Sequence, residues 1–363
     1  MTTVLGAPHI LLAGGGSGGS ATPVIAVAQR LRELSPEARL LLVGTKAGPE
    51  RRLATAAGIT FEAVASGKLR RYWSWSNVID PARVVAGVAM SAQLVRRFGP
   101  QAALGAGGSA SVPPLAAAAL LGVPVHIHQQ DAEPGLANRV LKPLARSCSV
   151  SLAASLAWFP PNKTMLVGNP VRASILDGDA DRARRAFELE HNVPLVLVTG
   201  GGTGALGLNR LVAAAASALV EHCQIVHLTG VGRGVPVPTP LPRYRQLEFV
   251  TTEMADLLAA ATLVLSRAGM GILAELAAVG KATVLVPMPD SHQAANAAAF
   301  VEQRAAVALE ERKLSGEQLA RVLVELLNAP QRLADLGRNM RDSMPRDAAE
   351  RLARRVLDLA ETS

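Results

Sequence analysis

The sequence predicts two doubly wound α/β domains, and three observations support this fold class. At 363 residues the chain is too long for one ordinary hydrophobic core. Short apolar runs alternate with helical patterns along most of its length, which is typical of parallel sheets with crossover helices. The stretch LLAGGGSGG at 11–19 recurs as LVTGGGTGA at 197–205. Each copy reads as a strand, a glycine loop and a helix, so we expect two domains with a ligand-binding cleft between them.

Nine apolar runs are expected to form strands. In chain order they are residues 9–13, 38–44, 102–107, 124–129, 194–200, 225–230, 247–250, 262–269 and 282–287. Helical patterns fill most of the intervals, beginning with TPVIAVAQRLREL at 22–34. Gly168 and Pro170 interrupt the alternation, so we place the first domain at 1–168 and the second at 169–344. A last helix, at about 345–363, is expected to pack back on the first domain.

Composition narrows the class of protein. Hydrophobic residues make up 49% of the chain, which favours a well-buried globular protein. The net charge of +8 implies an anionic partner, whether nucleic acid, an anionic membrane or a phosphorylated substrate. Cys148 and Cys223 stand alone, without the spacing of a metal site or a disulfide framework. A reducing cytoplasm fits best, and the N-terminus lacks the pattern of a signal peptide.

The first glycine loop, GGGSGGS at 14–20, separates an expected strand from an expected helix. Glycines let backbone N–H groups approach a phosphate, and the following helix turns its positive end toward the same point. Loops of this kind also occur for packing alone. A nicotinamide dinucleotide would need an acidic residue after the next strand, where this chain has Gly44 and Thr45. An oxidoreductase is therefore disfavoured.

Nine short motifs follow one another between about residue 10 and about residue 309. They are GGGSGG at Gly14, VGTKAGPE at Val43, GKLRRYWSW at Gly67, GAGGSAS at Gly105, HQQDAEPGLANR at His128, GNPVR at Gly168, GGGTGALGLN at Gly200, SRAGMGILAEL at Ser266 and HQAANA at His292. In this order they resemble the MurG-type UDP-N-acetylglucosaminyltransferases. The resemblance implies a GT-B fold, in which two Rossmann-like domains face each other across a cleft.

The same resemblance implies a reaction. UDP-GlcNAc would donate GlcNAc, with inversion and without a metal or cofactor, to the C4 hydroxyl of lipid I, the undecaprenyl-diphospho-MurNAc-pentapeptide. The product would be lipid II, which serves peptidoglycan synthesis and hence cell shape and division. DGDAD at 177–181 has the carboxylate spacing of a metal site, but its place before a helical pattern favours helix capping instead.

A nucleotide-sugar site should combine a carboxylate for the ribose diol with backbone N–H groups and cationic or amide side chains. The resemblance implies eight donor-binding residues, which are Arg172, Gly202, Thr203, Val250, Met270, Glu275, Gln293 and Asn296. Glu275 would hold the ribose and Arg172 the diphosphate, although a surface glutamate and a solvated linker arginine are the plain alternatives. The amides of Gln293 and Asn296 would meet the sugar, and the backbone of Val250 the uracil.

The acceptor half departs from the family pattern. The expected acceptor and phosphate loops contain Gly16, Ser17, Gly18, Gly19, Ser20, Gly107, Gly108 and Ser109. Ser20 stands where the family has histidine, and Ser109 where it has tyrosine. Gln129 and Asp131 replace the glutamate and asparagine of the family's HEQN motif. In the donor half, Gly202 and Thr203 replace serine and glutamine.

These departures leave three functions open. Because most donor matches hold, we favour an active lipid I transferase. The alternatives are a GT-B transferase that acts on a different lipid and an inactive homologue that binds nucleotide sugar. The attacking hydroxyl needs a general base, and Ser20 is far too weak. We therefore expect Asp131 to be the base, with His128 second, unless Asp131 only hydrogen-bonds the local turn.

A basic, aromatic segment at 67–97 is a candidate membrane surface. It holds Trp73 and Trp75 beside Arg70 and Arg71, in a chain with only 3% aromatic residues. Such a mixture suits a bilayer interface, although an amphipathic core helix with a solvated basic face is the alternative. The resemblance favours docking on the anionic cytoplasmic face of the cell membrane and leaves room for contacts with other cell-wall synthesis proteins. The sequence contains no recognisable nucleic-acid module.

Overall fold

The computed structural model describes residues 7–15, 18–46, 48, 50–64, 76–202, 204–237 and 241–362. The chain divides into two compact units. The first comprises Met1–Arg172 and Pro345–Ser363, and the second comprises Ala173–Met344. The first change of unit therefore follows residue 172, a little beyond the position expected from Gly168 and Pro170.

A parallel sheet forms the centre of the first unit, in the order β3-β2-β1-β4-β5-β6-β7. Its strands are β1 (His9–Ala13), β2 (Arg39–Gly44), β3 (Thr60–Ala63), β4 (Ala102–Gly105), β5 (Val125–Gln129), β6 (Ser147–Val150) and β7 (Thr164–Leu166). Successive residues of β1 point to opposite faces, and all are apolar from Ile10 to Ala13. Both faces of the sheet are therefore covered by helices, as parallel sheets require.

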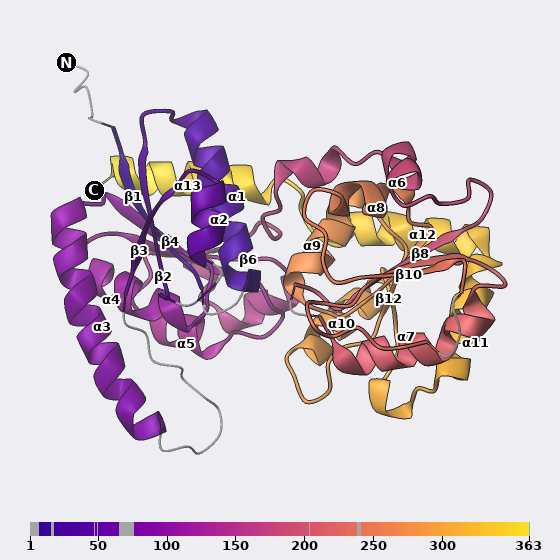
Figure 1. Ribbon diagram of the computed structural model, residues 1–363. Coiled ribbons are helices and arrows are strands. Elements are labelled where there is room, and N and C mark those ends of the chain that lie inside the picture. The colour runs from indigo at the N-terminus through magenta and orange to yellow at the C-terminus, as the bar shows by residue number, and fades with distance from the viewer. Residues whose placement is uncertain are drawn as a thin grey trace. The chain divides into compact units, whose positions relative to one another are not determined.

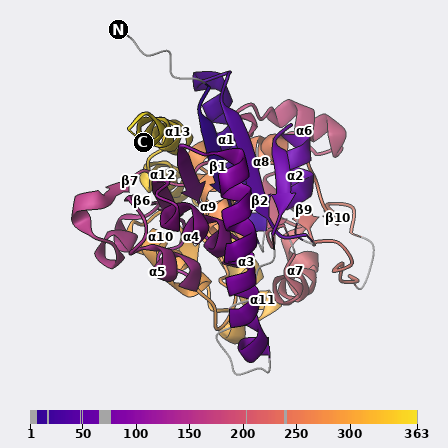
Figure 2. The ribbon, with the colours of Figure 1, turned by 90° about the vertical axis from the view of Figure 1, so that its left-hand side faces the viewer.

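Helices cover this sheet in two layers (Figures 1 and 2). One layer holds α1 (Gly18–Leu34), α2 (Glu50–Ala56) and α13 (Ala348–Glu361), and the other holds α3 (Ser76–Phe98), α4 (Val112–Leu120) and α5 (Leu136–Leu141). α13 packs against α1, with Leu352, Val356 and Leu359 buried along one stripe. The C-terminal helix thus completes the core of the first unit.

The second unit repeats this plan with the strand order β10-β9-β8-β11-β12-β13. Its strands are β8 (Leu195–Thr199), β9 (Gln224–Leu228), β10 (Tyr244–Leu247), β11 (Leu263–Ser266), β12 (Thr283–Leu285) and β13 (Val307–Ala308). β8 occupies the place that β1 holds in the first sheet, with the next two strands of the chain on one side. The repeated glycine loops therefore follow equivalent strands.

Two helical layers also enclose the second sheet (Figure 1). α7 (Leu206–Leu219) and α11 (Gly316–Leu327) pack together on one face, and α6 (Ala180–Ala186), α8 (Met254–Ala260) and α9 (Met270–Val279) form the other layer. α10 (Gln293–Glu302) and α12 (Pro330–Asp342) complete the unit. Gly280 ends α9 with a φ of 68°, in the left-handed conformation that favours glycine at a helix terminus.

The structure confirms the parallel α/β class and eight of the nine expected strands, and it places the ninth elsewhere. The run 247–250 was expected to be a strand, but β10 is Tyr244–Leu247 and ends where that run begins. Phe249 beyond it is half exposed, at 52%. Four short strands, β3, β6, β7 and β13, were not expected, because their two to four residues carry too little apolar pattern.

Candidate functional site

The first glycine loop (14–20) and the second (105–111) lie side by side. They follow β1 and β4, which are paired strands of one parallel sheet and so end at the same edge. A Cβ atom on Gly108 would lie 2.1 Å from the carbonyl oxygen of Gly15 and 2.9 Å from Oγ of Ser20. The φ of Gly108 is 83°, so both space and conformation restrict this position to glycine. The structure thus brings Gly108 and Ser20 into contact.

The remaining residues of these loops fall into three groups. Gly18, Gly19 and Ser20 form the beginning of α1, and Ser20 is buried at 6% exposure. Ser109 begins the short 3₁₀ turn η1 (Ser109–Ser111), directly after Gly107 and Gly108. Gly16 and Ser17 lie outside the described residues.

The segment after β5 joins the same edge of the sheet. The Gln129 amide donates to the carbonyl oxygen of Asp131 at 2.7 Å and accepts from Asn138 Nδ2 at 2.8 Å. Gln130 Nε2 donates to the carbonyl oxygen of Ala106 at 2.7 Å, which ties the ends of β5 and β4 together. Gln129, where the family has glutamate, is therefore a buried structural residue in this chain.

Asp131 is the candidate base, and its backbone is held firmly. Its carbonyl oxygen accepts from Gln129 and also from Ser155 Oγ at 3.1 Å. The residue is partly exposed, unlike Gln129 and Gln130 beside it. A carboxylate on a fixed backbone at the carboxyl edge of the sheet is suitably placed to receive a proton from a substrate in that region.

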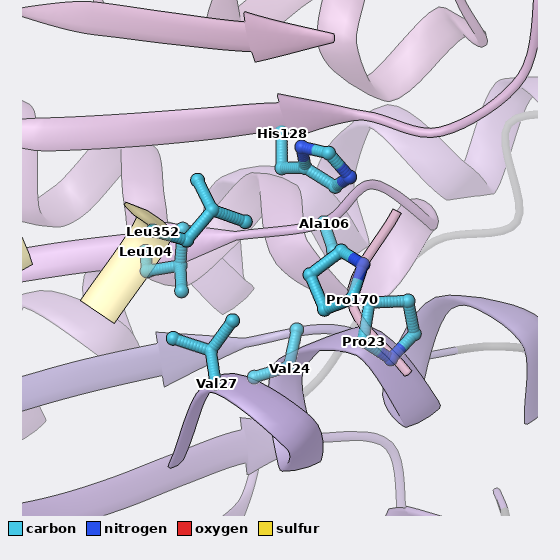
Figure 3. A pocket seen from close by; sticks show the side chains of 8 residues that line it. All are labelled: Pro23, Val24, Val27, Leu104, Ala106, His128, Pro170 and Leu352. Atoms are coloured by element: carbon cyan, nitrogen blue, oxygen red, sulfur yellow. The ribbon is translucent and has the colours of Figure 1, made fainter. Parts of the chain in front are cut away.

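His128 has a different environment. It is fully buried, and its ring nitrogens lie 2.9 Å from Ser149 Oγ and 3.1 Å from Asn169 Oδ1. Burial lowers the pKa of its imidazole to about 4. Figure 3 shows the ring beside Pro23 and Pro170, among apolar side chains that line a pocket in the first unit. This position argues against the role of proton acceptor that the sequence suggested for His128.

His128 belongs to a buried polar network. His126 lies 2.7 Å from Ser147 Oγ and 2.8 Å from Ser149 Oγ, and the latter hydroxyl also contacts His128. Burial lowers the pKa of His126 to about 3, and the nearby charges of His128 and Arg355 act in the same direction. Both imidazoles are therefore neutral at physiological pH. They fix β5 against β6 and, through Asn169, against the end of the first unit.

The third glycine loop, 200–205, follows β8 in the second unit. Gly201 N donates to Thr199 Oγ1 at 3.2 Å, and Gly204 N donates to the carbonyl oxygen of Gly201 at 2.9 Å. A Cβ atom on Gly204 would lie 2.1 Å from the carbonyl oxygen of Thr229. Gly202 is exposed, and a Cβ atom there would meet nothing within 4 Å. The loop is thus closely packed at its base and open at Gly202; Thr203 lies outside the described residues.

The beginning of α9 is similarly open. Met270 is the first residue of this ten-residue helix, and a Cβ atom on Gly269 or Gly271 would meet nothing within 4 Å. Glu275 lies farther along α9 and is partly exposed, between the buried residues Ala274 and Leu276. Backbone N–H groups at a helix N-terminus favour an anion, and a carboxylate farther along can accept from a diol.

Gln293 and Asn296 are held by backbone groups of two loops. Gln293 Oε1 accepts from Ala268 N at 3.3 Å and from Met288 N at 2.9 Å. Asn296 is fully buried and donates to the carbonyl oxygen of Ala268 at 3.0 Å. Because a backbone N–H can only donate, these contacts identify the oxygen of the Gln293 amide, which leaves its NH₂ group for a ligand. Asn296 holds the loop that contains Ala268 through this hydrogen bond.

Two further residues at this edge were not expected from the sequence. Phe249, before Val250, is half exposed beyond β10, and Arg233 Nη1 donates to the carbonyl oxygen of Gly204 at 2.9 Å. Their position in the segments that follow β10 and β9 is the signal that would have found them. Arg172 is the last residue of the first unit, whereas the other expected donor residues belong to the second.

The acidic stretch 177–181 caps a helix, as expected. Asp179 precedes α6, and its Oδ1 accepts from the backbone N–H groups of Asp181 and Arg182 at 2.8 and 3.1 Å. These hydrogen bonds lower the pKa of the Asp179 carboxyl group. The carboxylate therefore serves the helix N-terminus.

Two parallel sheets of this order, each with a glycine loop after its central strand, define the two-domain GT-B fold. Comparison with known sequences gives the family. Residues 10–150 match the glycosyltransferase family 28 N-terminal domain, and residues 195–352 match the family 28 C-terminal domain. The chain belongs to glycosyltransferase family 28.

Two curated relatives share the same printed name, UDP-N-acetylglucosamine–N-acetylmuramyl-(pentapeptide) pyrophosphoryl-undecaprenol N-acetylglucosamine transferase. The protein from Salinibacter ruber is 36% identical over 363 residues, covering 98% of each chain. The protein from Clostridium perfringens is 32% identical, covering 87% of this chain and 89% of its own. The crystal structure of Acinetobacter baumannii MurG has a TM-score of 0.74 at 24% identity, covering 97% of this chain and 99% of its own, and supports the fold.

The buried histidines predict a loss of stability in acid. The folded protein keeps His126 and His128 neutral down to about pH 3 and 4, whereas an unfolded imidazole takes up a proton near pH 6.5. The unfolded state therefore binds more protons below pH 6.5, so the free energy of unfolding falls as pH is lowered. Each histidine should contribute a slope of about 1.4 kcal/mol per pH unit between pH 6 and 4.5.

Urea denaturation at several pH values measures this slope. In His128→Gln, the slope of the free energy of unfolding against pH should decrease by about 1.4 kcal/mol per pH unit between pH 6 and 4.5. This decrease is expected whatever the effect of the substitution on stability at pH 7. The control is His191→Gln, because His191 is an exposed histidine of the second unit. An unchanged slope in His128→Gln would show that the imidazole is not kept neutral by the fold.

Proposed function

We propose that this chain transfers GlcNAc from UDP-GlcNAc to the C4 hydroxyl of lipid I and so forms lipid II for peptidoglycan synthesis. The observation that carries the proposal is the similarity over 98% of the chain to a relative named for this reaction. The arrangement of the donor residues in the second unit supports it, because two open backbone segments and a fixed amide follow the carboxyl ends of strands in one sheet, and the Glu275 carboxylate lies farther along α9.

Each donor residue has a specific role in this proposal. Glu275 accepts hydrogen bonds from the ribose diol, and the backbone of Val250 binds the uracil edge. The third glycine loop with Gly202, and with Thr203 beyond the described residues, meets the diphosphate together with the beginning of α9 at Met270 and with Arg172. The NH₂ group of Gln293 donates to a hydroxyl oxygen of the sugar, while Asn296 holds the loop in which Gln293 is anchored.

The reaction exchanges one bond for another. The C4 oxygen of the acceptor forms a bond to the anomeric carbon, the bond from that carbon to the diphosphate breaks, and UDP leaves with the electron pair. The acceptor proton passes to Asp131, and the charge that develops on the diphosphate is stabilised by backbone N–H groups and Arg172. The first and second glycine loops, with Gly107, Gly108 and Ser109, face the diphosphate of the lipid acceptor.

The direct test is an assay of the purified protein with UDP-GlcNAc and a soluble lipid I analogue in the presence of EDTA. We expect undiminished formation of the disaccharide, because protein groups supply the charge stabilisation. Binding of UDP-GlcNAc without transfer would identify an inactive homologue. Transfer only to a different lipid would identify a different acceptor, and a requirement for a divalent cation would contradict the proposed role of the loops.

The proposed base is tested by Asp131→Asn, which restores the usual family residue while removing the carboxylate. We expect turnover to fall roughly 10²-fold with the affinity for UDP-GlcNAc unchanged, because a general base contributes about that much. Glu133→Gln is the matched control, since Glu133 is an exposed carboxylate two residues away. Turnover equal to that of the parent in Asp131→Asn would remove Asp131 from the mechanism.

We further propose that the first unit docks on the anionic cytoplasmic face of the cell membrane. Trp73, Trp75, Arg70 and Arg71 lie outside the described residues, but a described surface of the first unit carries a similar mixture of side chains. Its exposed apolar residues lie on α5, on the turn that follows it and on the 3₁₀ turn η2 (Ala153–Trp158); they are Leu136, Val140, Leu144, Leu156 and Trp158. Within the part of the chain that the structure describes, no helix is long and apolar enough to cross a bilayer.

Two cations accompany this α5–η2 surface. The Arg139 guanidinium lies 5.5 Å from the centre of the Trp158 ring, and Lys142 Nζ donates to the carbonyl oxygen of Trp158 at 3.0 Å. An exposed tryptophan held between cations is suited to the boundary between lipid headgroups and acyl chains. The surface therefore favours anionic lipid as its partner.

Vesicle sedimentation tests the docking surface. Arg139→Gln combined with Trp158→Ser should weaken binding to phosphatidylserine vesicles roughly tenfold, because each cation contributes about 1 kcal/mol and the aromatic anchor is also lost. Activity on a soluble acceptor should be retained. Leu176→Ser removes a comparably exposed apolar residue from the second unit and serves as the control. Unchanged vesicle binding in the double variant would exclude this surface from docking.

A further inference from the structure

A buried ion pair in the second unit connects the loops that carry the proposed donor residues. Arg267 directly follows β11 and is 6% exposed. It pairs with Glu311, the first residue of the 3₁₀ turn η5 (Glu311–Lys313) beyond β13. Placing two charges in the interior costs solvation, so a buried pair is retained only where its geometry and hydrogen bonds are favourable.

The Arg267 guanidinium also holds the segment that follows β12. Its Nη1 donates to the carbonyl oxygens of Val286 at 2.9 Å and Pro287 at 3.3 Å. One planar cation therefore joins the chain after β11, the chain after β12 and the turn after β13. Lysine would not reproduce this arrangement, because it lacks the planar guanidinium whose Nη1 makes these contacts while Nη2 lies near Gly207.

Glu311 extends the connection to α7, the helix after the third glycine loop. A Cβ atom on Gly207, in the first turn of α7, would lie 1.9 Å from Glu311 Oε1 and 3.4 Å from Arg267 Nη2. The carboxylate thus occupies the space that a side chain at Gly207 would fill. The strand β12 and the helices α7, α9 and α10 that these contacts connect are labelled in Figure 1.

The side chain of Gln293 is held by two backbone N–H groups, one a residue beyond Arg267 and the other a residue beyond Pro287, which Arg267 contacts. Ala268 N and Met288 N both donate to Gln293 Oε1, and Ala268 directly follows Arg267 just as Met288 follows Pro287. The carbonyl oxygen of Ala268 also accepts from Asn296. The direction in which the Gln293 NH₂ group points therefore depends on two backbone positions that the Arg267–Glu311 pair fixes.

From these contacts we infer that Arg267 and Glu311 are positioning residues for recognition of the donor sugar. They act through the backbone of Ala268 and Met288, which orients the amide of Gln293 toward the sugar hydroxyls. The inference rests on the proposed function, since it takes the ligand of Gln293 to be the sugar of a nucleotide sugar. The uracil and ribose are held by Val250 and Glu275, and the diphosphate is common to both sugar nucleotides, so the preference between two sugars isolates the effect on Gln293.

Calorimetric binding of UDP-GlcNAc, its C4 epimer UDP-GalNAc and UDP separates these effects. In Arg267→Lys and in Glu311→Gln, we expect the preference for UDP-GlcNAc over UDP-GalNAc to fall tenfold or more, while the affinity for UDP stays within twofold of the parent. Arg312→Gln is the matched control. Arg312 is adjacent to Glu311 in sequence and pairs with Asp290, but both side chains are exposed, and such pairs contribute little.

An unchanged sugar preference in both variants would overturn the inference, as would a parallel loss of UDP affinity, which would indicate general loosening of the unit. Glu311→Gln keeps the shape of the side chain and so provides a result if Arg267→Lys does not fold. Equal binding of the two sugars by the parent would also overturn it. Because these measurements need no transfer, a parent that binds UDP-GlcNAc but fails to glycosylate lipid I overturns the proposed reaction alone.

Discussion

Backbone contact between neighbouring loops, at distances that exclude a Cβ atom, is the constraint on which both units depend. Parallel strands that pair in a sheet end at the same edge, so the segments that follow them are packed closely together. A glycine allows this close packing in both units. Gly108 lies against Gly15 in the first unit, and Gly204 lies against Thr229 in the second. In the proposed function a diphosphate binds at these loops, so the glycines that satisfy the packing requirement would also allow its close approach to the backbone.

The part of the structure that the sequence predicts is the part that depends on local pattern. Apolar runs bounded by glycine identify the central strands, and the repeated glycine loops identify the two units, because both signals lie within about ten residues. The C-terminal helix was expected to pack on the first domain, and its stripe of Leu352, Val356 and Leu359 is buried there. Short edge strands such as β13, with two residues, give no comparable signal.

The supports of the candidate site were not predictable in this way. His128 contacts Asn169 across 41 residues, and Arg267 contacts Glu311 across 44. No local spacing relates these partners, and each residue alone has a plausible reading as a catalytic base or a surface charge. Only the fold shows that His128 is enclosed and kept neutral and that Arg267 is paired. Sequence motifs therefore locate the site, whereas its rigidity comes from polar pairs that long-range packing creates.

Two departures from the family pattern, Gln129 at the end of β5 and Asp131 after it, show how such packing constrains chemistry. Gln129 donates through Nε2 to the carbonyl oxygens of Asp131 and Glu133 and accepts from Asn138. A glutamate carboxylate could accept from Asn138 but could not donate to either carbonyl, so this local hydrogen-bond network requires the neutral amide. The family's negative charge is thus absent from the buried position 129 and present instead at the partly exposed position 131, where it need not be desolvated. The two departures are therefore best understood as one change, in which the carboxylate moves from the interior toward the face that a substrate can reach.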